Sequence, residues 1–312
     1  MLRKYTIAII MFLCLQASAQ DTCKVGIFIT DIYDLNLADK SFAAQFWLWG
    51  LYKNDSIKIL ENMELTGAKD HEYSLSTTER RGKYNYATQK GKATFKKDWN
   101  ITNFPFDRQK LAITIESGDA EHNELVYLAD TKNSSYDASH IKIEGWKISK
   151  FETKAEVKSY TSNYGDPEIT GKAQYSSFIA TITLERDGWG LFFKLFTGLY
   201  VAFAISLLPF FMGPENAERF GVLVGALFAA VANKYVVDSI LPETNDYTLV
   251  DKIHVLAFVY VLISLIMTVL AYRLFAIGKN NLAKKIDWWA FWVTFISFFS
   301  INVYLIVKVF IS

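Results

Sequence analysis

The chain has 312 residues, a formal net charge of +1 and a hydrophobic content of 51%. Its 33 basic residues balance 32 acidic ones and form no long basic run, which argues against bulk nucleic-acid binding. The apolar excess is concentrated in the last third of the chain, so we expect one modest globular domain followed by a membrane domain.

The N-terminus has the pattern of a secretory signal peptide. Basic residues at positions 3 and 4 precede an apolar run, Ile7–Leu15, and the small residues 17–19 form a cleavage site. We therefore expect residues 1–19 to be removed, with an uncleaved anchor as the alternative. The signal peptide would take one of the two cysteines with it, leaving Cys23 as a lone thiol without an internal disulfide.

Residues 20–187 have the pattern of an antiparallel β-sandwich. Short apolar or alternating stretches are separated by turn residues, and no helical period is sustained. The strand candidates are Val25–Ile32, Phe42–Tyr52, Tyr84–Thr88, Leu111–Ile115 and Phe178–Leu184. Many short strands in a segment of this length favour a sandwich over a doubly wound fold.

The segment 188–312 predicts a transmembrane domain of four helices. The expected helices are 195–214, 220–240, 253–274 and 288–311. The linker between the third and fourth carries four basic residues against one acidic residue, so it is expected to be cytoplasmic. Four spans then place the sandwich and the C-terminus outside, as the signal peptide also requires.

The second span carries an unusual stripe of small, aromatic or weakly polar residues. Steps of three and four along a helix collect Glu218, Gly221, Gly225, Phe228, Ala232, Tyr235 and Ser239. One interpretation is close packing against a neighbouring helix. The other is the wall of a water-filled pore formed by several copies of the chain.

On the pore interpretation, a ring of Glu218 carboxylates attracts cations, and Phe228 or Tyr235 forms a hydrophobic barrier that closes the pore. If Arg219 faced the pore instead, the field would cancel or reverse and favour anions. Lys234 and Asp238 are four residues apart on the same helix, which predicts a local ion pair rather than a selectivity element.

Five landmarks resemble a known family when they are taken in order. They are Phe46–Leu48, the loop Phe104–Gln109 reading FPFDRQ, Arg186 before the first span, Ile240–Pro242 after the second and Thr248–Lys252 before the third. The sequence resembles the pentameric ligand-gated ion channels of the Cys-loop receptor superfamily, which includes nicotinic acetylcholine receptors. The resemblance covers nearly all of the mature chain. Lys97 and Leu111 replace the two cysteines that bracket this loop in animal members, as in the prokaryotic branch.

The resemblance implies a homopentamer in a bacterial inner membrane, in which the periplasmic sandwich is a ligand-binding-type domain that gates the pore. The residues implied in coupling the sandwich to the pore are Asp39, Phe104, Pro105, Phe106, Asp107, Arg186, Pro242 and Thr248. Arg186 is expected to pair with Asp107 and with Asp39. Plain surface salt bridges are the alternative.

The family binds its agonists between subunits, beneath a hairpin that here spans Val157–Tyr175. The candidate ligand-binding residues are Tyr52, Tyr127, Tyr160, Tyr164 and Tyr175, whose rings would cage an organic cation. Ordinary structural tyrosines are the alternative for each. The acidic residues Glu116, Asp119 and Glu121 could bind Ca²⁺ or sense protons, but a solvated loop is the favoured interpretation.

No enzyme motif is present, and the four histidines lack metal-ligand spacing, so we expect no catalysis, metal or cofactor. The sequence predicts a cation-selective, ligand-gated channel subunit. Its partners would be further copies of itself, the lipid bilayer, monovalent cations and an unidentified small-molecule or proton agonist, without nucleic acid. A non-conducting membrane-anchored sensor of the same fold and an anion-selective channel are the alternatives.

Overall fold

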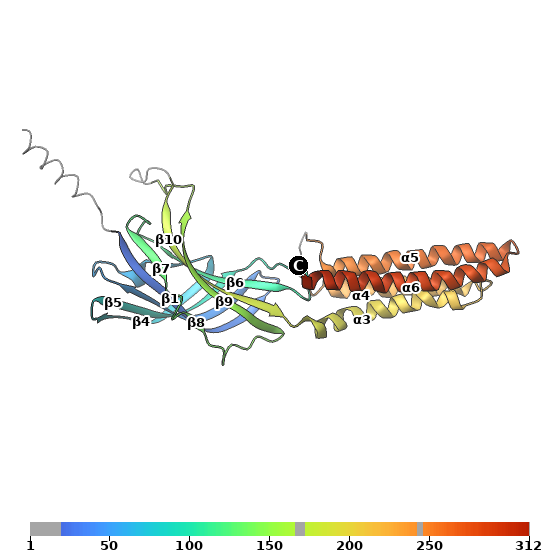
Figure 1. The fold of residues 1–312 in the computed structure, drawn as a ribbon, viewed down its shortest axis with the longest axis horizontal. Helices are drawn as coiled ribbons and strands as arrows, with labels where there is room; N and C mark the ends of the chain where they lie inside the picture. Colours follow the sequence, from blue (N-terminus) through green and yellow to red (C-terminus); the bar gives the residue numbers. More distant parts are fainter. Residues whose placement is uncertain (1–19, 166–171, 242–245, 312) are drawn as a thin grey trace, which may run out of the picture.

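The structure is a computed structural model that describes residues 20–165, 172–241 and 246–311. A domain of β-strands is joined end to end to a bundle of long helices, so the molecule is elongated (Figure 1). The predicted order of a sheet domain followed by four apolar helices is confirmed. The expected signal peptide, residues 1–19, and the coupling residue Pro242 lie outside the described residues.

The sheet domain contains two sheets. The first has the order β4 (Ala68–Arg81), β5 (Tyr84–Lys96), β2 (Ser41–Tyr52), β1 (Asp21–Asn36) and β7 (Leu125–Ala129), and β8 (Ser135–Tyr136) also pairs with β1. The second has the order β3 (Met63–Thr66), β6 (Arg108–Ser117), β10 (Gln174–Arg186) and β9 (Trp146–Ser159), and a short helix α2 (Ile59–Asn62) precedes β3. The pairs are antiparallel, except that β7 and β8 run parallel to β1.

One hydrophobic core joins the facing sides of the two sheets. In β6, buried Leu111, Ile113 and Ile115 alternate with residues that face outward, because successive side chains of a strand point to opposite faces. Cys23 of β1 lies in the same core, and burial raises the pKa of its thiol to about 12. This cysteine therefore behaves as a small core residue rather than as a reactive thiol.

The sequence analysis missed two long strands, and both are charged edge strands. β4 lies at one edge of the first sheet and β9 at one edge of the second. Neither has a clear apolar alternation, because most of their residues are exposed. Charged residues on an edge strand discourage pairing with other chains, so their presence fits this position. β4 and β9 are strands because their backbones pair with β5 and β10, and not because their sequences have a hydrophobic period.

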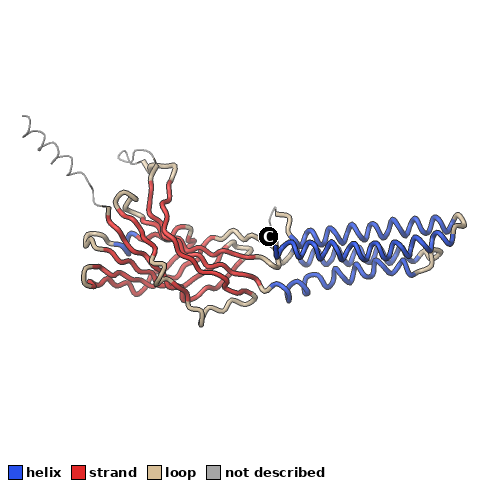
Figure 2. Tube along the Cα trace, viewed as in Figure 1, coloured by secondary structure: helices blue, strands red, loops and turns tan. Residues whose placement is uncertain are grey.

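The helical domain consists of four long helices that lie side by side (Figure 2). They are α3 (Gly188–Leu207, continued by the 3₁₀ turn η2, Leu208–Phe211), α4 (Glu218–Asp238), α5 (Leu249–Ala276) and α6 (Asn280–Ile311). Each helix is long and apolar enough to cross a membrane, so the chain is a multi-pass membrane protein. The helices begin two to eight residues before the expected spans, since their first turns include residues too polar for a hydropathy pattern.

Aromatic residues pack the helices of the bundle together. Phe203 of α3 stacks on Phe298 of α6 with ring centroids 3.7 Å apart, and Tyr260 of α5 contacts the same ring at 5.5 Å. All three side chains are buried in one cluster. The cluster holds α3, α5 and α6 together, and α4 joins it through Ala230 and Val237 on its buried side.

Candidate pore face and coupling interface

Helix α4 turns one face away from its own bundle. The stripe expected from the sequence lies on this face, and every one of its members is exposed in the single chain. These residues are Glu218, Gly221, Gly225, Phe228, Ala232, Tyr235 and Ser239. Phe228 and Tyr235 are 71% and 78% exposed, more than any other large hydrophobic residue of α4. In a membrane this face would meet lipid, other copies of the chain, or the water of a pore that those copies form.

The opposite face of α4 is buried and carries Arg219. The buried residues of this helix are Arg219, Leu223, Ala226, Ala230 and Val237. They lie about half a turn around the helix from the stripe. Arg219 is 0% exposed, and its Nη2 donates a hydrogen bond of 2.5 Å to Oδ1 of Asp287 on α6. Arg219 therefore does not share the exposed face with Glu218.

The other end of α4 is tied to its neighbours by polar side chains. Lys234 forms the predicted ion pair with Asp238 and a second pair of 2.9 Å with Asp251 of α5. Asn233 Oδ1 lies 3.0 Å from Nε2 of His254 on α5, and its amide donates to a backbone carbonyl of α3. The sequence predicts only the contact within the helix, because the other three contacts join different helices.

Asp107 and Arg186 form a nearly buried ion pair where the sheet domain meets the helices. Asp107 is 2% exposed, and Arg186 donates to it twice, from Nε at 2.6 Å and from Nη2 at 3.3 Å. Gln109 donates a further hydrogen bond of 2.7 Å to the same carboxylate. The guanidinium also lies over the rings of Trp146, at 3.9 Å, and Phe104, at 5.0 Å. Two-point pairing and stacking fix this arginine in one geometry.

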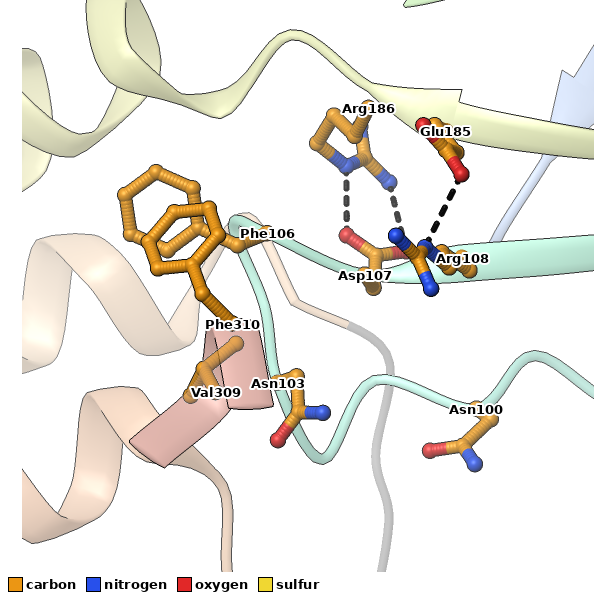
Figure 3. A pocket seen from close by; sticks show the side chains of 9 residues that line it. All are labelled: Asn100, Asn103, Phe106, Asp107, Arg108, Glu185, Arg186, Val309 and Phe310. Atoms are coloured by element: carbon orange, nitrogen blue, oxygen red, sulfur yellow. Dashed lines mark hydrogen bonds and ion pairs between the residues drawn. The ribbon is translucent and has the colours of Figure 1, made fainter. Parts of the chain in front are cut away.

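The loop that carries Asp107 is packed against the ends of two helices (Figure 3). A Cβ atom at Gly188, the first residue of α3, would lie 2.1 Å from the carbonyl oxygen of Pro105, so this close approach requires glycine. The Phe106 ring contacts Trp189 of α3 at 4.9 Å and Phe310 of α6 at 5.1 Å. Beside these rings lies a cavity of about 290 Å³ lined in part by Phe106, Asp107, Arg108, Glu185, Arg186 and Phe310.

The same loop holds the beginning of α5. The carbonyl oxygen of Thr102 accepts a hydrogen bond of 2.8 Å from the backbone amide of Leu249. Thr248, an expected coupling residue, is the N-cap of α5 and forms a reciprocal capping box with Asp251. Because Asp251 also pairs with Lys234, the loop is linked to α4 through the first turn of α5.

Asp39 does not take the expected position beside Arg186. Its carboxylate accepts a hydrogen bond of 2.6 Å from the side chain of Asn36, and its backbone carbonyl accepts one from Lys69. The turn that carries Asp39 is exposed. Asp39 therefore stabilises the connection between β1 and β2, and Asp107 alone is the carboxylate that pairs with Arg186 among the described residues.

The tyrosines expected to bind a ligand fall into two groups. Tyr160, Tyr164 and Tyr175 form a cluster at the β9–β10 hairpin, with ring centroids 6.0 to 6.3 Å apart. Tyr52 and Tyr127 are instead 4% and 2% exposed and belong to the core of the sandwich. Burial raises the pKa of both core phenols. These two tyrosines are core residues, so the hairpin cluster does not include them.

Two charged residues that the ligand-site prediction did not include contact this cluster. Tyr160 donates a hydrogen bond of 2.6 Å to Glu116 Oε1, and Lys158 Nζ lies 4.9 Å from the centroid of the Tyr160 ring. Burial and the Glu116 hydrogen bond raise the pKa of Tyr160. Burial acts to lower the pKa of Lys158, but its contacts with Tyr160 and Glu116 outweigh this effect and raise it. The two-residue spacing of Lys158 and Tyr160 could have predicted this contact, because residues two apart on a strand share a face.

No protein-family model matches the sequence, and no curated protein matches it. Within residues 20–165, 172–241 and 246–311, no three His, Cys, Asp or Glu side chains are grouped so that they could hold a metal ion. Glu116, expected in an acidic cluster with Asp119 and Glu121, contacts Tyr160 and Lys158 instead.

We predict that removing one partner of the Asp107–Arg186 pair destabilises the protein strongly. Arg186→Gln should lower the free energy of unfolding by about 3 kcal/mol or more, because it leaves the Asp107 carboxylate buried without its cation. Arg108→Gln is the matched control. It breaks the Arg108–Glu185 pair of 3.0 Å, whose side chains are 72% and 41% exposed, and should cost under about 1 kcal/mol.

Denaturant unfolding of the purified protein, followed by tryptophan fluorescence, measures both variants. Equal small losses in the two variants would contradict the prediction that Asp107 needs Arg186 as its buried partner. The double variant Arg186→Glu with Asp107→Arg should be more stable than Arg186→Glu alone but less stable than the native protein. The reason is that the Gln109 amide, which donates to the Asp107 carboxylate, would face an arginine in the double variant.

Proposed function

We propose that the chain is a subunit of a cation-selective, ligand-gated ion channel that assembles as a homopentamer in a bacterial inner membrane. In this proposal the sandwich lies in the periplasm, and α4 from each subunit lines the pore. One observation carries the proposal: the exposed face of α4 is a stripe of small and weakly polar residues with a carboxylate at one end.

The contrast between α4 and α6 supports a pore rather than a lipid contact. The exposed residues of α6 include Trp288, Trp289, Val293 and Ile296, the bulky side chains that suit lipid and the membrane interface. The α4 stripe has two glycines whose open sides meet no atom within 4 Å. Beside the stripe, Val224, Leu227 and Val231 are exposed and apolar, as expected where neighbouring subunits pack.

The charges at the beginning of α4 support cation selectivity. Glu218 is exposed on the stripe, whereas Arg219 is buried on the opposite face and paired with Asp287. A ring of Glu218 carboxylates would therefore attract cations without an adjacent ring of arginines. This arrangement argues against the anion-selective alternative.

The linkage through the Thr102–Asp107 loop supports gating by the sheet domain. The loop is bound to the last residue of β10 through Arg186 and to the first turn of α5 through Leu249. Asp251 in that turn pairs with Lys234 of α4. A displacement of the sandwich would thus reach the pore-lining helix through contacts that are all charged or hydrogen-bonded.

Reversal potentials test the proposal directly. Purified protein in planar bilayers under asymmetric NaCl should give a current that reverses near the Na⁺ potential once an activating pH or small-molecule ligand is found. Glu218→Gln should shift the reversal potential toward zero, because it removes the ring of charge while keeping the side-chain volume. A reversal near the Cl⁻ potential would contradict the assignment of Glu218.

If protein that is shown to be assembled gives no current under any condition, the non-conducting sensor is favoured. Native mass spectrometry measures that assembly and is expected to give five copies.

Phe228 should act as the closed barrier of the pore. Phe228→Ala removes the bulkiest group from the middle of the stripe, so water and ions should enter the resting channel and current should flow without a stimulus. Val224→Ala, on the same helix beside the stripe, is the control and should stay closed. An unchanged resting conductance in well-expressed Phe228→Ala pentamers would exclude Phe228 as the barrier.

A further inference from the structure

The strand registers place Lys158 beside the tyrosine cluster. Tyr175 of β10 lies opposite Lys158 of β9, and Ser177 of β10 lies opposite Glu116 of β6. Side chains two residues apart on a strand share a face, so Lys158, Tyr175 and Glu116 all lie on the outer face of this sheet. Tyr160 follows Lys158 by two residues and lies on the same side.

The contacts of Lys158 are those that an organic cation would make. Its ammonium lies 4.9 Å from the centroid of the Tyr160 ring and 3.4 Å from Glu116 Oε2. The Glu116 side chain is only 8% exposed, and its other oxygen accepts the hydroxyl of Tyr160. An aromatic face and a nearly buried carboxylate are the two groups that recognise ammonium ligands, and a cation of the chain itself contacts both.

We propose that Lys158 is a built-in occupant of the cation-binding position at this hairpin and therefore excludes organic cations from it. An amine ligand would have to displace the lysine, or else share one carboxylate with a second positive charge. Lys158 is thus a specificity-determining residue. The inference rests on the proposed function only because it takes the hairpin as the agonist site. It predicts that small amines do not act at the hairpin of the native protein.

Choline binding to the purified full-length protein tests this inference by isothermal titration calorimetry. Lys158→Met removes the charge and keeps most of the stem, so it should bind choline about tenfold or more tightly than the native protein. Lys158→Gln, a second neutral variant, should show the same gain. Lys158→Arg retains a cation and should bind as weakly as the native protein.

Lys154→Met is the matched control. Lys154 lies on the same strand, and its ammonium pairs with exposed Glu156 rather than with the cluster, so its removal should not change choline binding. Adding Glu116→Gln to Lys158→Met should abolish the gain, since the carboxylate is then absent. A melting curve for each variant identifies any that fail to fold.

The inference is overturned if choline binds the native protein and both neutral variants equally, or if Lys154→Met gains as much as Lys158→Met. Binding is measured without current, so a protein that never conducts still gives a result. Conversely, a channel that conducts but shows no gain in Lys158→Met overturns this inference and leaves the proposed function intact.

Discussion

The buried ion pair of Arg219 and Asp287 determines which face of α4 looks away from the bundle. A charged guanidinium is costly in a membrane interior and needs an internal partner. If α4 rotated by half a turn, Arg219 would leave Asp287, and Leu223 and Ala226 would lose their packing. The orientation of Glu218 and Phe228 therefore follows from a contact on the other side of the helix.

A second buried pair, Asp107 with Arg186, lies at the opposite end of the helical domain. Neither pair adds much net stability, because the free energy of taking two charges out of water is about as large as their mutual attraction. Their attested role in proteins is to specify one arrangement. In this chain one pair fixes the rotation of α4, and the other fixes the loop at Asp107 on the end of β10.

These two fixed points give the proposed channel a simple mechanical layout. The sandwich is held by the loop at Asp107, and the loop is hydrogen-bonded to the beginning of α5. α4 is held by Lys234 at that end and by Arg219 at the other. A ligand at the hairpin would act on β10, which ends at Arg186, so the proposed site and the proposed pore would lie on one continuous path.

The parts of the fold that depend on local apolar patterns could be predicted from the sequence. Alternation in β6 and β10, the four spans and the α4 stripe are such patterns, since each repeats at the period of its element. Charged edge strands such as β4 and β9 could not be found, because backbone pairing rather than burial holds them. Their charges resemble those of a solvated loop.

The candidate site follows the same division. The pairing of Asp107 with Arg186 was expected from the family resemblance, whereas the partner of Arg219 lies 68 residues away and no local pattern points to it. A sequence does not tell a core tyrosine from a surface tyrosine when both lie in strands, so Tyr52 and Tyr127 were grouped with the hairpin. The interaction of Lys158 with Glu116 needs the registers of three strands.

The central claim is that the exposed face of α4 meets water inside an assembled pore. Single cysteines at Gly225, Ala232 and Leu223 test it, with a membrane-impermeant thiol reagent applied to active protein in bilayers. The account predicts that the reagent blocks current through Gly225→Cys and Ala232→Cys but leaves Leu223→Cys unaffected, because Leu223 is 1% exposed and packed in the bundle. Protection of Gly225→Cys and Ala232→Cys with reaction at Leu223→Cys would contradict the account.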